Sequence, residues 1–221
     1  ILNEYGLKVF YADVDPINGQ LTPDKLLECI KKNKIKNLKV FFTMYLGGSP
    51  YNIKKFYNIK KKFNSYMIED ACHALGSKYK INSKVFPIGS CKHSDISIFS
   101  FHPLKSITTG EGGALTTNNK NLYYKAQLFR SHGIKRSKYH WSYDVVEYGL
   151  NYRLSDINCA LGISQLKKIK KFLQKRKSIS KHYIKEISKL RPLKISDQFS
   201  DLSAWHLFRI NIDFNKIKIS K

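Results

Sequence analysis

The sequence predicts an α/β domain with a mostly parallel sheet, followed by the start of a smaller α+β C-terminal domain. Apolar, strand-like segments alternate with amphipathic helical segments up to residue 70, which is typical of parallel strands joined by crossover helices. Two further strand-like segments follow at 95–100 and 113–117, and new elements begin after residue 190. With 221 residues, 42% of them hydrophobic, the chain can form one sizeable domain and part of a second.

The N-terminal part begins with a short strand candidate at residues 8–12, and turn-forming residues follow at 13–19. Thr22 is suited to cap a helix because its hydroxyl can accept a hydrogen bond from the first turn, and a proline follows at the first helical position. We expect this helix to end near Lys36. Its inward face carries Leu26, Leu27 and Ile30.

The unbroken apolar segment 39–44 predicts a buried strand, and a glycine-containing loop follows it. Residues 53–63 have helical periodicity, and the next strand, at 65–68, ends on Glu69 and Asp70. These segments predict β-α-β units with a parallel sheet. The inward side of the second helix carries Phe56 and Ile59.

The strands expected at 95–100 and 113–117 are separated by about a dozen residues, which is near the lower limit for a parallel crossover. We therefore expect the second of them to run antiparallel to the first. Residues 123–130 are predicted to form a helix. The polar, aromatic stretch 135–148 is expected to be a loop.

Ser155 is expected to cap a long helix that is interrupted once and ends near Ile187. The elements after it form a new set, since Pro192 follows and the pattern becomes strand-like again. We therefore divide the chain into a large domain at 1–150, a connecting long helix at 151–187 and the start of a small domain at 188–221.

Both ends of the chain look interrupted. It begins with Ile1 rather than methionine and stops shortly after the strand-like segment 208–212, so we expect a fragment that lacks both ends. No apolar run approaches the length of a membrane span, and the first residues do not form a signal peptide. We therefore expect a soluble, cytoplasmic protein with no membrane partner.

The formal net charge of +24 raises the question of nucleic-acid binding, because Lys and Arg neutralise phosphates. Arginine, which is suited to bidentate recognition of bases and phosphates, is scarce in this chain. The lysines are spread along most of the sequence, which favours a solvated, lysine-rich surface over a nucleic-acid partner.

The four cysteines include no CxxC pair, so the sequence indicates neither a disulfide framework nor a common zinc motif. The one arrangement to weigh combines Cys72, His73, Cys91 and His93, and its spacing matches no common structural zinc pattern. We expect no metal.

A first chemical segment follows the strand at 65–68. Asp70 and His73 come just past its carboxyl end, at the edge where open α/β sheets bind their ligands. A carboxylate there can pair with a protonated ring nitrogen, and the imidazole can offer a hydrogen bond to a neighbouring oxygen. A strand-ending aspartate and a core histidine would leave the same pattern, so the segment alone does not decide between the two.

A second chemical segment spans 97–113, where a strand leads into a loop with one lysine, Lys105, and returns through glycines. Apolar neighbours would partly desolvate this amine, lower its pKa and free it for Schiff-base chemistry. Hydroxyl groups suited to binding phosphate lie in the same segment. They belong to Ser100, Thr108 and Thr109.

These segments resemble the DegT/DnrJ-type sugar aminotransferases, which share the fold of the aspartate aminotransferases. The pattern E-D-A-x-x-A-L-G stands at 69–76, and F-S-F-H-x-x-K-x-I-T-T-x-E-G-G stands at 99–113. R-S-H-G follows at 130–133, and G-L-N-Y-R-L-S at 149–155. The resemblance covers essentially the whole chain in order, and the long lysine motif is highly specific.

The resemblance implies pyridoxal 5'-phosphate as the cofactor and Lys105 as the Schiff-base lysine, which also moves the proton between substrate and cofactor. By the same resemblance, Asp70 pairs with the pyridinium nitrogen. His73 occupies a position that is often glutamine in the family and touches the phenolic oxygen of the cofactor. Ser100 is implied as a ligand of the cofactor phosphate.

The resemblance also implies a homodimer with shared active sites. Asn151 matches a residue that reaches the cofactor phosphate from the neighbouring subunit, and Arg153 is its companion in the same loop. Family members begin with a Ser-Gly-Thr turn at a helix N-terminus, which holds the phosphate, and with an aromatic residue that stacks on the ring. Both would precede Ile1.

The implied reaction is amino transfer from an amino acid, L-glutamate by family habit, to the 4-keto group of a nucleotide-linked deoxysugar. The motifs are most similar to those of the pseudaminic-acid branch of the family, whose substrate is UDP-2-acetamido-2,6-dideoxy-4-hexulose. Another nucleotide-keto-sugar, of the perosamine type, is an alternative. A third reading is a non-catalytic regulator or partner subunit with the same fold.

Overall fold

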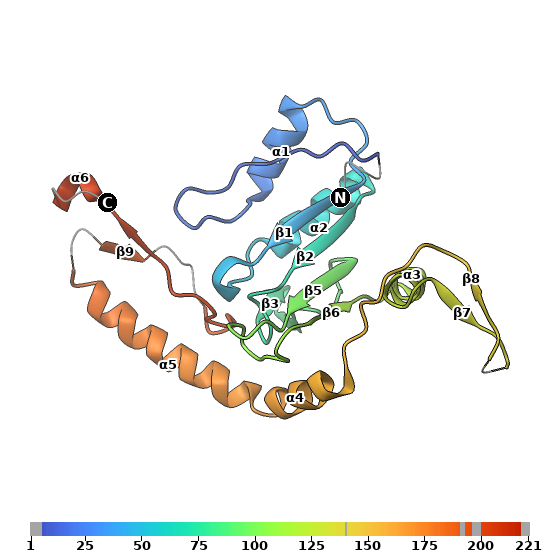
Figure 1. Cartoon of the computed structure of the whole chain (residues 1–221). Helices are drawn as coiled ribbons and strands as arrows, with labels where there is room; N and C mark the ends of the chain where they lie inside the picture. The colour runs from blue at the N-terminus through green and yellow to red at the C-terminus, as the bar shows by residue number, and fades with distance from the viewer. Residues whose placement is uncertain (1–5, 140, 191–192, 196–199, 218–221) are drawn as a thin grey trace.

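The computed structural model describes residues 6–139, 141–190, 193–195 and 200–217. A four-stranded sheet with the order β1-β2-β5-β6 lies at its centre (Figure 1). β1, β2 and β5 run parallel, and β6 is antiparallel to β5, as the sequence predicted. The four strands are Val40–Met44, Tyr66–Asp70, Ile96–Ser100 and Gly113–Thr116.

Helix α1 (Pro23–Lys32) starts as predicted, because the Thr22 hydroxyl accepts a hydrogen bond from the backbone N–H of Lys25. It ends earlier than the expected Lys36, since the backbone and side-chain amides of Asn33 both donate to the Cys29 carbonyl and close the last turn. Helix α2 (Ile53–Phe63) has the predicted bounds.

One of two hydrophobic cores in the described residues lies between these two helices and one face of the sheet. Its buried members are Leu26, Ile30, Phe41, Phe56, Ile59 and Met67. The expected inward position of Leu27 is wrong: Cys29 is buried instead, because positions i, i+3 and i+4 share one face of a helix. The expectation of a fully buried β1 is also wrong, since Phe42 is 46% exposed on the opposite face, which α1 and α2 do not cover.

Two stretches differ from the sequence prediction. Residues 8–12 form no strand, because no strand of the described chain pairs with them. The expected loop at 135–148 contains the antiparallel hairpin of β7 (Ile134–Arg136) and β8 (Tyr143–Val145). Sequence reasoning also missed the hairpin of β3 (Lys78–Ile81) and β4 (Lys84–Pro87).

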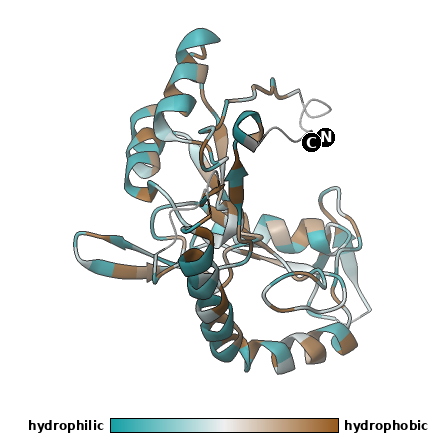
Figure 2. Ribbon diagram, turned by 90° about the vertical axis from the view of Figure 1, so that its left-hand side faces the viewer, coloured by the Kyte–Doolittle hydropathy of each residue, from teal (hydrophilic) through white to brown (hydrophobic). Residues whose placement is uncertain are grey.

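After β6 the chain forms α3, the β7–β8 hairpin and then two further helices. Figure 1 shows these two helices, α4 and α5, following one another along the outside of the molecule. Ser155 caps α4 as expected, and the interruption before α5 is also confirmed. Figure 2 shows apolar residues on outward parts of the helices, and Ile157 of α4 is 84% exposed. The remaining elements are η2 (Leu46–Gly48), α3 (Lys120–Arg130), α4 (Asp156–Leu166), α5 (Ile169–Ile187), β9 (Leu193–Ile195), β10 (Ile210–Ile212) and α6 (Phe214–Ile217).

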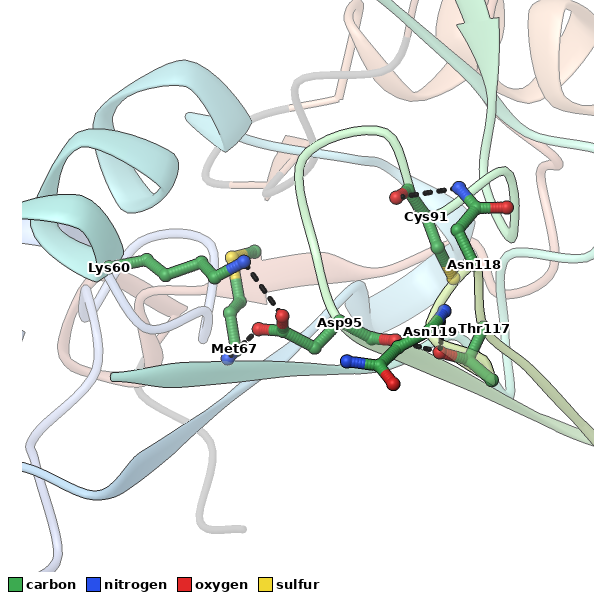
Figure 3. A network of polar contacts seen from close by, with 7 residues as sticks. All are labelled: Lys60, Met67, Cys91, Asp95, Thr117, Asn118 and Asn119. Atoms are coloured by element: carbon green, nitrogen blue, oxygen red, sulfur yellow. Dashed lines mark hydrogen bonds and ion pairs between the residues drawn. The ribbon is translucent and has the colours of Figure 1, made fainter. Parts of the chain in front are cut away.

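Asp95 contacts several elements at the amino end of β5 (Figure 3). This end of the sheet is opposite the edge where the predicted site lies. Its carboxylate forms an ion pair of 2.8 Å with Lys60 of α2 and accepts a hydrogen bond of 2.8 Å from the backbone N–H of Met67 in β2. Its carbonyl accepts a hydrogen bond from the Thr117 hydroxyl after β6. The ion pair is mostly shielded from water, and the same carboxylate also accepts the hydrogen bond from the backbone. Asp95 therefore fixes the positions of α2 and β2 relative to the start of β5.

Candidate active site

The carboxyl ends of the parallel strands carry the residues that the sequence singled out. Asp70 is the last residue of β2, and Ser100 is the last residue of β5, so both lie at the same edge of the sheet. The loop after β1 joins this edge, because the backbone N–H of Tyr45 donates to the Asp70 carbonyl at 3.2 Å.

The Asp70 carboxylate is held by the residues that follow it. It accepts a hydrogen bond of 3.0 Å from the backbone N–H of Cys72. Burial and then the hydrogen bond and charge of Asp70 raise the pKa of the Cys72 thiol to about 11, against the opposing positive charge of Lys105. Lys105 therefore lies close enough to Cys72 to act on it electrostatically.

The loop that carries Lys105 is closed by its own hydrogen bonds. The backbone N–H of Lys105 donates to the His102 carbonyl at 2.9 Å, and that of Thr109 donates to the Phe101 carbonyl at 3.0 Å. Lys105 itself is half-buried. Of the apolar residues expected to shield the amine, Leu104 next to Lys105 is 75% exposed, whereas Ile107 is buried.

Helix α4 supports this loop from outside. The Asn158 side-chain amide donates to the Thr109 carbonyl. A Cβ atom at Gly162 would come within 2.8 Å of the Thr109 methyl group, so the close approach of helix and loop requires glycine at this position.

His73 is oriented by the turn after β1. Its Nδ1 accepts a hydrogen bond of 3.4 Å from the backbone N–H of Gly47, so the neutral ring carries its proton on Nε2. Burial lowers the pKa of His73, and the positive charges of Lys105 and Arg209 lower it further, while Asp70 opposes them. The neutral imidazole can therefore donate one hydrogen bond from Nε2.

His206, which sequence reasoning missed, packs against His73 with 4.5 Å between the ring centroids. Only 9% of it is exposed, and its Nδ1 is buried with no hydrogen-bond partner in the described part of the chain. The backbone around it is docked on the turn after β1, since the N–H of His206 donates to Gly47 at 2.8 Å and that of Ala204 to Gly48 at 2.9 Å. No local pattern marks His206, because it meets His73 only through the tertiary fold.

Acidification from about pH 6.5 toward about pH 4 should destabilise the protein through His206. Burial, followed by the charges of His73, Arg176 and Lys105, lowers the pKa of His206 to about 4. Between this value and the ordinary histidine pKa of about 6.5, the unfolded chain binds more protons than the folded chain, so the free energy of unfolding falls as pH falls. The contribution is at most about 1.4 kcal/mol per pH unit for one proton.

The measurement is denaturant unfolding at about pH 7 and about pH 5 for the native sequence and for His206→Phe, which keeps a ring against His73. The variant should lose less stability on acidification. The matched control is His182→Phe, at an exposed position on α5, which should respond to pH as the native sequence does. An unchanged pH response of His206→Phe would contradict the assignment.

Asn151 and Arg153 are exposed and lie on the segment between β8 and α4. Asn151 forms an isolated antiparallel bridge with Ser131. In the described part of the chain, no hydrogen bond joins either residue to Ser100 or Lys105. The structure thus gathers Asp70, His73, Ser100 and Lys105 at one edge within a single chain, but it does not bring Asn151 and Arg153 into contact with them.

Glu69, next to Asp70, has a structural role. It is 2% exposed and accepts hydrogen bonds from the Tyr45 hydroxyl at 2.7 Å and from the Ser97 hydroxyl. Since successive strand residues face opposite sides, this buried network fixes β2 from the core side while Asp70 faces the other way.

The cysteine and histidine residues weighed as zinc ligands have other partners. The Cys91 thiol donates to the Thr116 carbonyl at 3.2 Å, and His93 shares a hydrogen bond of 2.8 Å with the Tyr79 hydroxyl. Among the described residues, no group of three or more His, Cys, Asp or Glu is placed to hold a metal ion. Within the same residues, no helix is long and apolar enough to span a membrane.

Comparisons with known proteins match all or nearly all of the chain. The sequence pattern of the DegT/DnrJ/EryC1/StrS aminotransferase family matches residues 1–221. The UDP-4-amino-4,6-dideoxy-N-acetyl-beta-L-altrosamine transaminase of Campylobacter jejuni strain 81-176 is 42% identical over 208 residues, which are 93% of this chain and 52% of that protein. The chain therefore spans about half the length of such relatives.

Solved structures agree with this match. Helicobacter pylori PseC, an aminotransferase involved in the biosynthesis of pseudoaminic acid, superposes with a TM-score of 0.86 at 31% identity, over 98% of this chain and 56% of that one. A putative sugar aminotransferase of Streptococcus pneumoniae, in its PLP form, gives a TM-score of 0.81 at 25% identity, over 96% of this chain and 56% of that one. The fold is the α/β fold of these aminotransferases, and the chain belongs to the DegT/DnrJ/EryC1/StrS aminotransferase family.

Proposed function

We propose that this protein transfers an amino group from an amino acid, L-glutamate, to the 4-keto group of a nucleotide-linked deoxysugar. We propose UDP-2-acetamido-2,6-dideoxy-4-hexulose as the acceptor, because the Campylobacter relative is named for a UDP-linked, N-acetylated 4-amino sugar. The observation that carries the proposal is the placement of Lys105 beside Asp70 and His73 at the carboxyl edge of a parallel sheet.

The residues at this edge fit pyridoxal 5'-phosphate. They offer an amine for the aldehyde, a carboxylate for the ring nitrogen, an imidazole N–H for the phenolic oxygen and the Ser100 hydroxyl for the phosphate. The buried Nδ1 of His206, unpartnered among the described residues, adds unused hydrogen-bonding capacity behind His73. When bound, this cofactor supplies an aldehyde that captures amines and a ring that withdraws electrons from the breaking C–H bond.

In this proposal, Lys105 has two roles. Its amine would hold the cofactor through the cofactor's aldehyde group, and the same amine, when free, would accept and return a proton at the substrate carbon. The short hydrogen-bonded loop keeps the lysine backbone fixed on one side, and the packing of Gly162 on Thr109 keeps it fixed on the other. The backbone of Lys105 is therefore held at a defined place at this edge of the sheet.

Asp70 and His73 would set the electronic state of the ring. The Asp70 carboxylate, which accepts a hydrogen bond from the backbone N–H of Cys72, would hold a proton on the ring nitrogen. His73, whose Nδ1 accepts a hydrogen bond from the backbone N–H of Gly47, would donate from Nε2 to the phenolic oxygen. Its lowered pKa keeps it neutral, so it contributes a directed donor without adding positive charge near the Lys105 amine.

We further propose that the protein works in the cytoplasm as a homodimer. Asn151 and Arg153, which are exposed and make no contact with Ser100 in their own chain, would reach the cofactor phosphate of the partner subunit. We propose a large domain at 1–150, a connecting long helix at 151–187 and a small domain from 188 onward.

The test is to incubate the protein with pyridoxal phosphate, L-glutamate and a set of nucleotide-linked 4-keto-sugars, and to identify products by mass spectrometry. The UDP-linked 2-acetamido sugar should gain an amine, and no product should form without glutamate. Amination of the perosamine-type substrate instead would move the assignment to another sugar. Failure with every keto-sugar, while the cofactor binds, would favour a non-catalytic protein of the same fold.

A further inference from the structure

His206 lies behind His73 and takes no part in the proposed chemistry. The two rings are 4.5 Å apart between centroids and are tilted by 39°. His206 is 9% exposed, and its Nδ1 is buried with no hydrogen-bond partner among the described residues. Its side chain is therefore held by packing against His73 rather than by a hydrogen bond from Nδ1.

One turn of the chain holds both histidines. The backbone N–H of Gly47 donates to His73 Nδ1 at 3.4 Å, and the Gly47 carbonyl accepts from the backbone N–H of His206 at 2.8 Å. At the next residue, Gly48, a Cβ atom would lie 2.5 Å from the His73 carbonyl oxygen and 3.1 Å from the Ala204 Cβ. Glycine at this position thus lets the segments of His73 and His206 approach the same turn closely.

Helix α5 supports His206 from the other side. The Arg176 guanidinium donates from Nη1 to the His206 carbonyl at 3.1 Å. The helix also packs closely on the loop that carries His73, since a Cβ atom at Gly76 would lie 2.4 Å from the Leu173 Cδ1. His206 therefore cannot move away from His73 without losing its contacts with both the turn and the helix.

The hydrogen bond from Gly47 does not fix the His73 ring by itself. Its length of 3.4 Å exceeds the usual range of about 2.7–3.2 Å, so the bond is weak. His73 is only half-buried, and the terminal torsion of an imidazole allows the ring to turn over, which would replace Nδ1 by a carbon at the Gly47 N–H. A second ring packed at 4.5 Å opposes this rotation and keeps water from one face of His73.

We propose that His206 is a positioning residue, which holds His73 in the orientation and tautomer with which Nε2 donates toward the cofactor. The identity of the acceptor rests on the proposed function, whereas the packing of the two histidines does not. The titratable and charged groups that act on the two rings, besides each other, are Asp70, Lys105, Arg176 and Arg209. His206 remains neutral near pH 7, because burial and then its positive neighbours lower its pKa to about 4, so it adds no charge beside His73.

The first test is an NMR titration of the full protein with ¹⁵N-labelled histidine, in which His73→Gln identifies the signals of His73. The native protein should show a neutral His73 with its proton on Nε2 and a pKa below the ordinary value of about 6.5. His206→Ala admits water to the ring, so the pKa of His73 should rise toward that value and both tautomers should appear. His206→Phe keeps a ring in place and should preserve the low pKa and the single tautomer.

The matched control is His182→Ala, at an exposed position on α5, which should leave the His73 signals unchanged. If His206→Ala does not fold, His206→Asn takes its place, because it also lacks a ring and leaves space for water but retains a polar side chain. A purely structural role for His206 would lower the stability of these variants without changing His73 in the folded protein. A native pKa and a single tautomer of His73 in the folded variant therefore overturn the proposal.

The second test adds pyridoxal phosphate and L-glutamate. Addition of the cofactor should shift the Nε2 signal of His73 in the native protein and in His206→Phe. The half-reaction in which L-glutamate gives its amino group to the cofactor should slow about tenfold or more in His206→Ala, since misplacing a positioned group by about 1 Å can cost about a hundredfold. His206→Phe should keep a rate near that of the native protein.

The two tests separate this inference from the proposed function. A native half-reaction rate in His206→Ala overturns the positioning role and leaves the proposed function standing. If the native protein performs no half-reaction, while the pKa and tautomer of His73 still depend on the ring at position 206, the proposed function is removed and the dependence of His73 on His206 is supported.

Discussion

Replacing Lys105 with alanine should abolish transamination and the long-wavelength absorbance of lysine-bound pyridoxal phosphate. Lys105 is the lysine of the long 99–113 motif, and it lies beside Asp70, where the electron-withdrawing ring would be held. Without its amine, the cofactor has no covalent anchor, and no group remains in place to carry the proton. Activity should therefore fall below detection, rather than decline by a small factor.

The measurement combines product analysis with borohydride reduction and peptide mapping of the modified lysine. In the native protein the reduced cofactor should be found on Lys105. Lys92→Ala, at an exposed position before β5, is the matched control and should retain both the absorbance and the activity. A reducible lysine adduct with turnover in Lys105→Ala would show that another lysine carries the cofactor.

Asp70→Asn should slow the chemical step on the order of a thousandfold or more while leaving cofactor binding measurable. Asparagine keeps the shape of the side chain and can still accept the hydrogen bond from the backbone N–H of Cys72. It lacks the negative charge that holds a proton on the ring nitrogen, so the ring withdraws electrons less effectively. The loss should therefore appear in the rate of the glutamate half-reaction.

Single-turnover spectroscopy with excess L-glutamate measures this rate directly. Asp144→Asn, at an exposed position in β8, removes the same charge far from the reacting atoms and should leave the rate unchanged. Near-normal turnover of Asp70→Asn would mean that Asp70 merely ends a strand.

Local sequence signals were sufficient where the structure depends on nearby residues. Helix α2 and the cap of α1 were predicted because helical periodicity and capping involve residues only three or four positions apart. The antiparallel course of β6 followed from the length of one connection. The hairpin of β3 and β4 also depends on nearby residues. Its two-residue turn is formed by Asn82 and Ser83, which take positive φ values of 48° and 64°.

The errors concerned strands that the local pattern does not settle. Residues 8–12 have strand-like composition, but a strand exists only when its backbone groups are paired, and no described strand lies beside them. The β7–β8 hairpin is exposed apart from the half-buried Ile134, and its two strands are only three residues long, so the segment lacks the alternation that marks a half-buried strand.

The sequence by itself determined the family, the order of most elements, and the positions of Asp70 at the end of a strand and of His73 and Lys105 in the loops that follow strands. Their placement at one edge of the sheet could be predicted from the sequence, because the carboxyl ends of parallel strands lie at the same edge. Only the tertiary structure decided that Gly47 fixes the tautomer of His73 and that His206 packs behind it. The physical reason is that burial and charge act through space. The pKa of His206 depends on neighbours that are distant in sequence, so the sequence alone does not show that they are close to it.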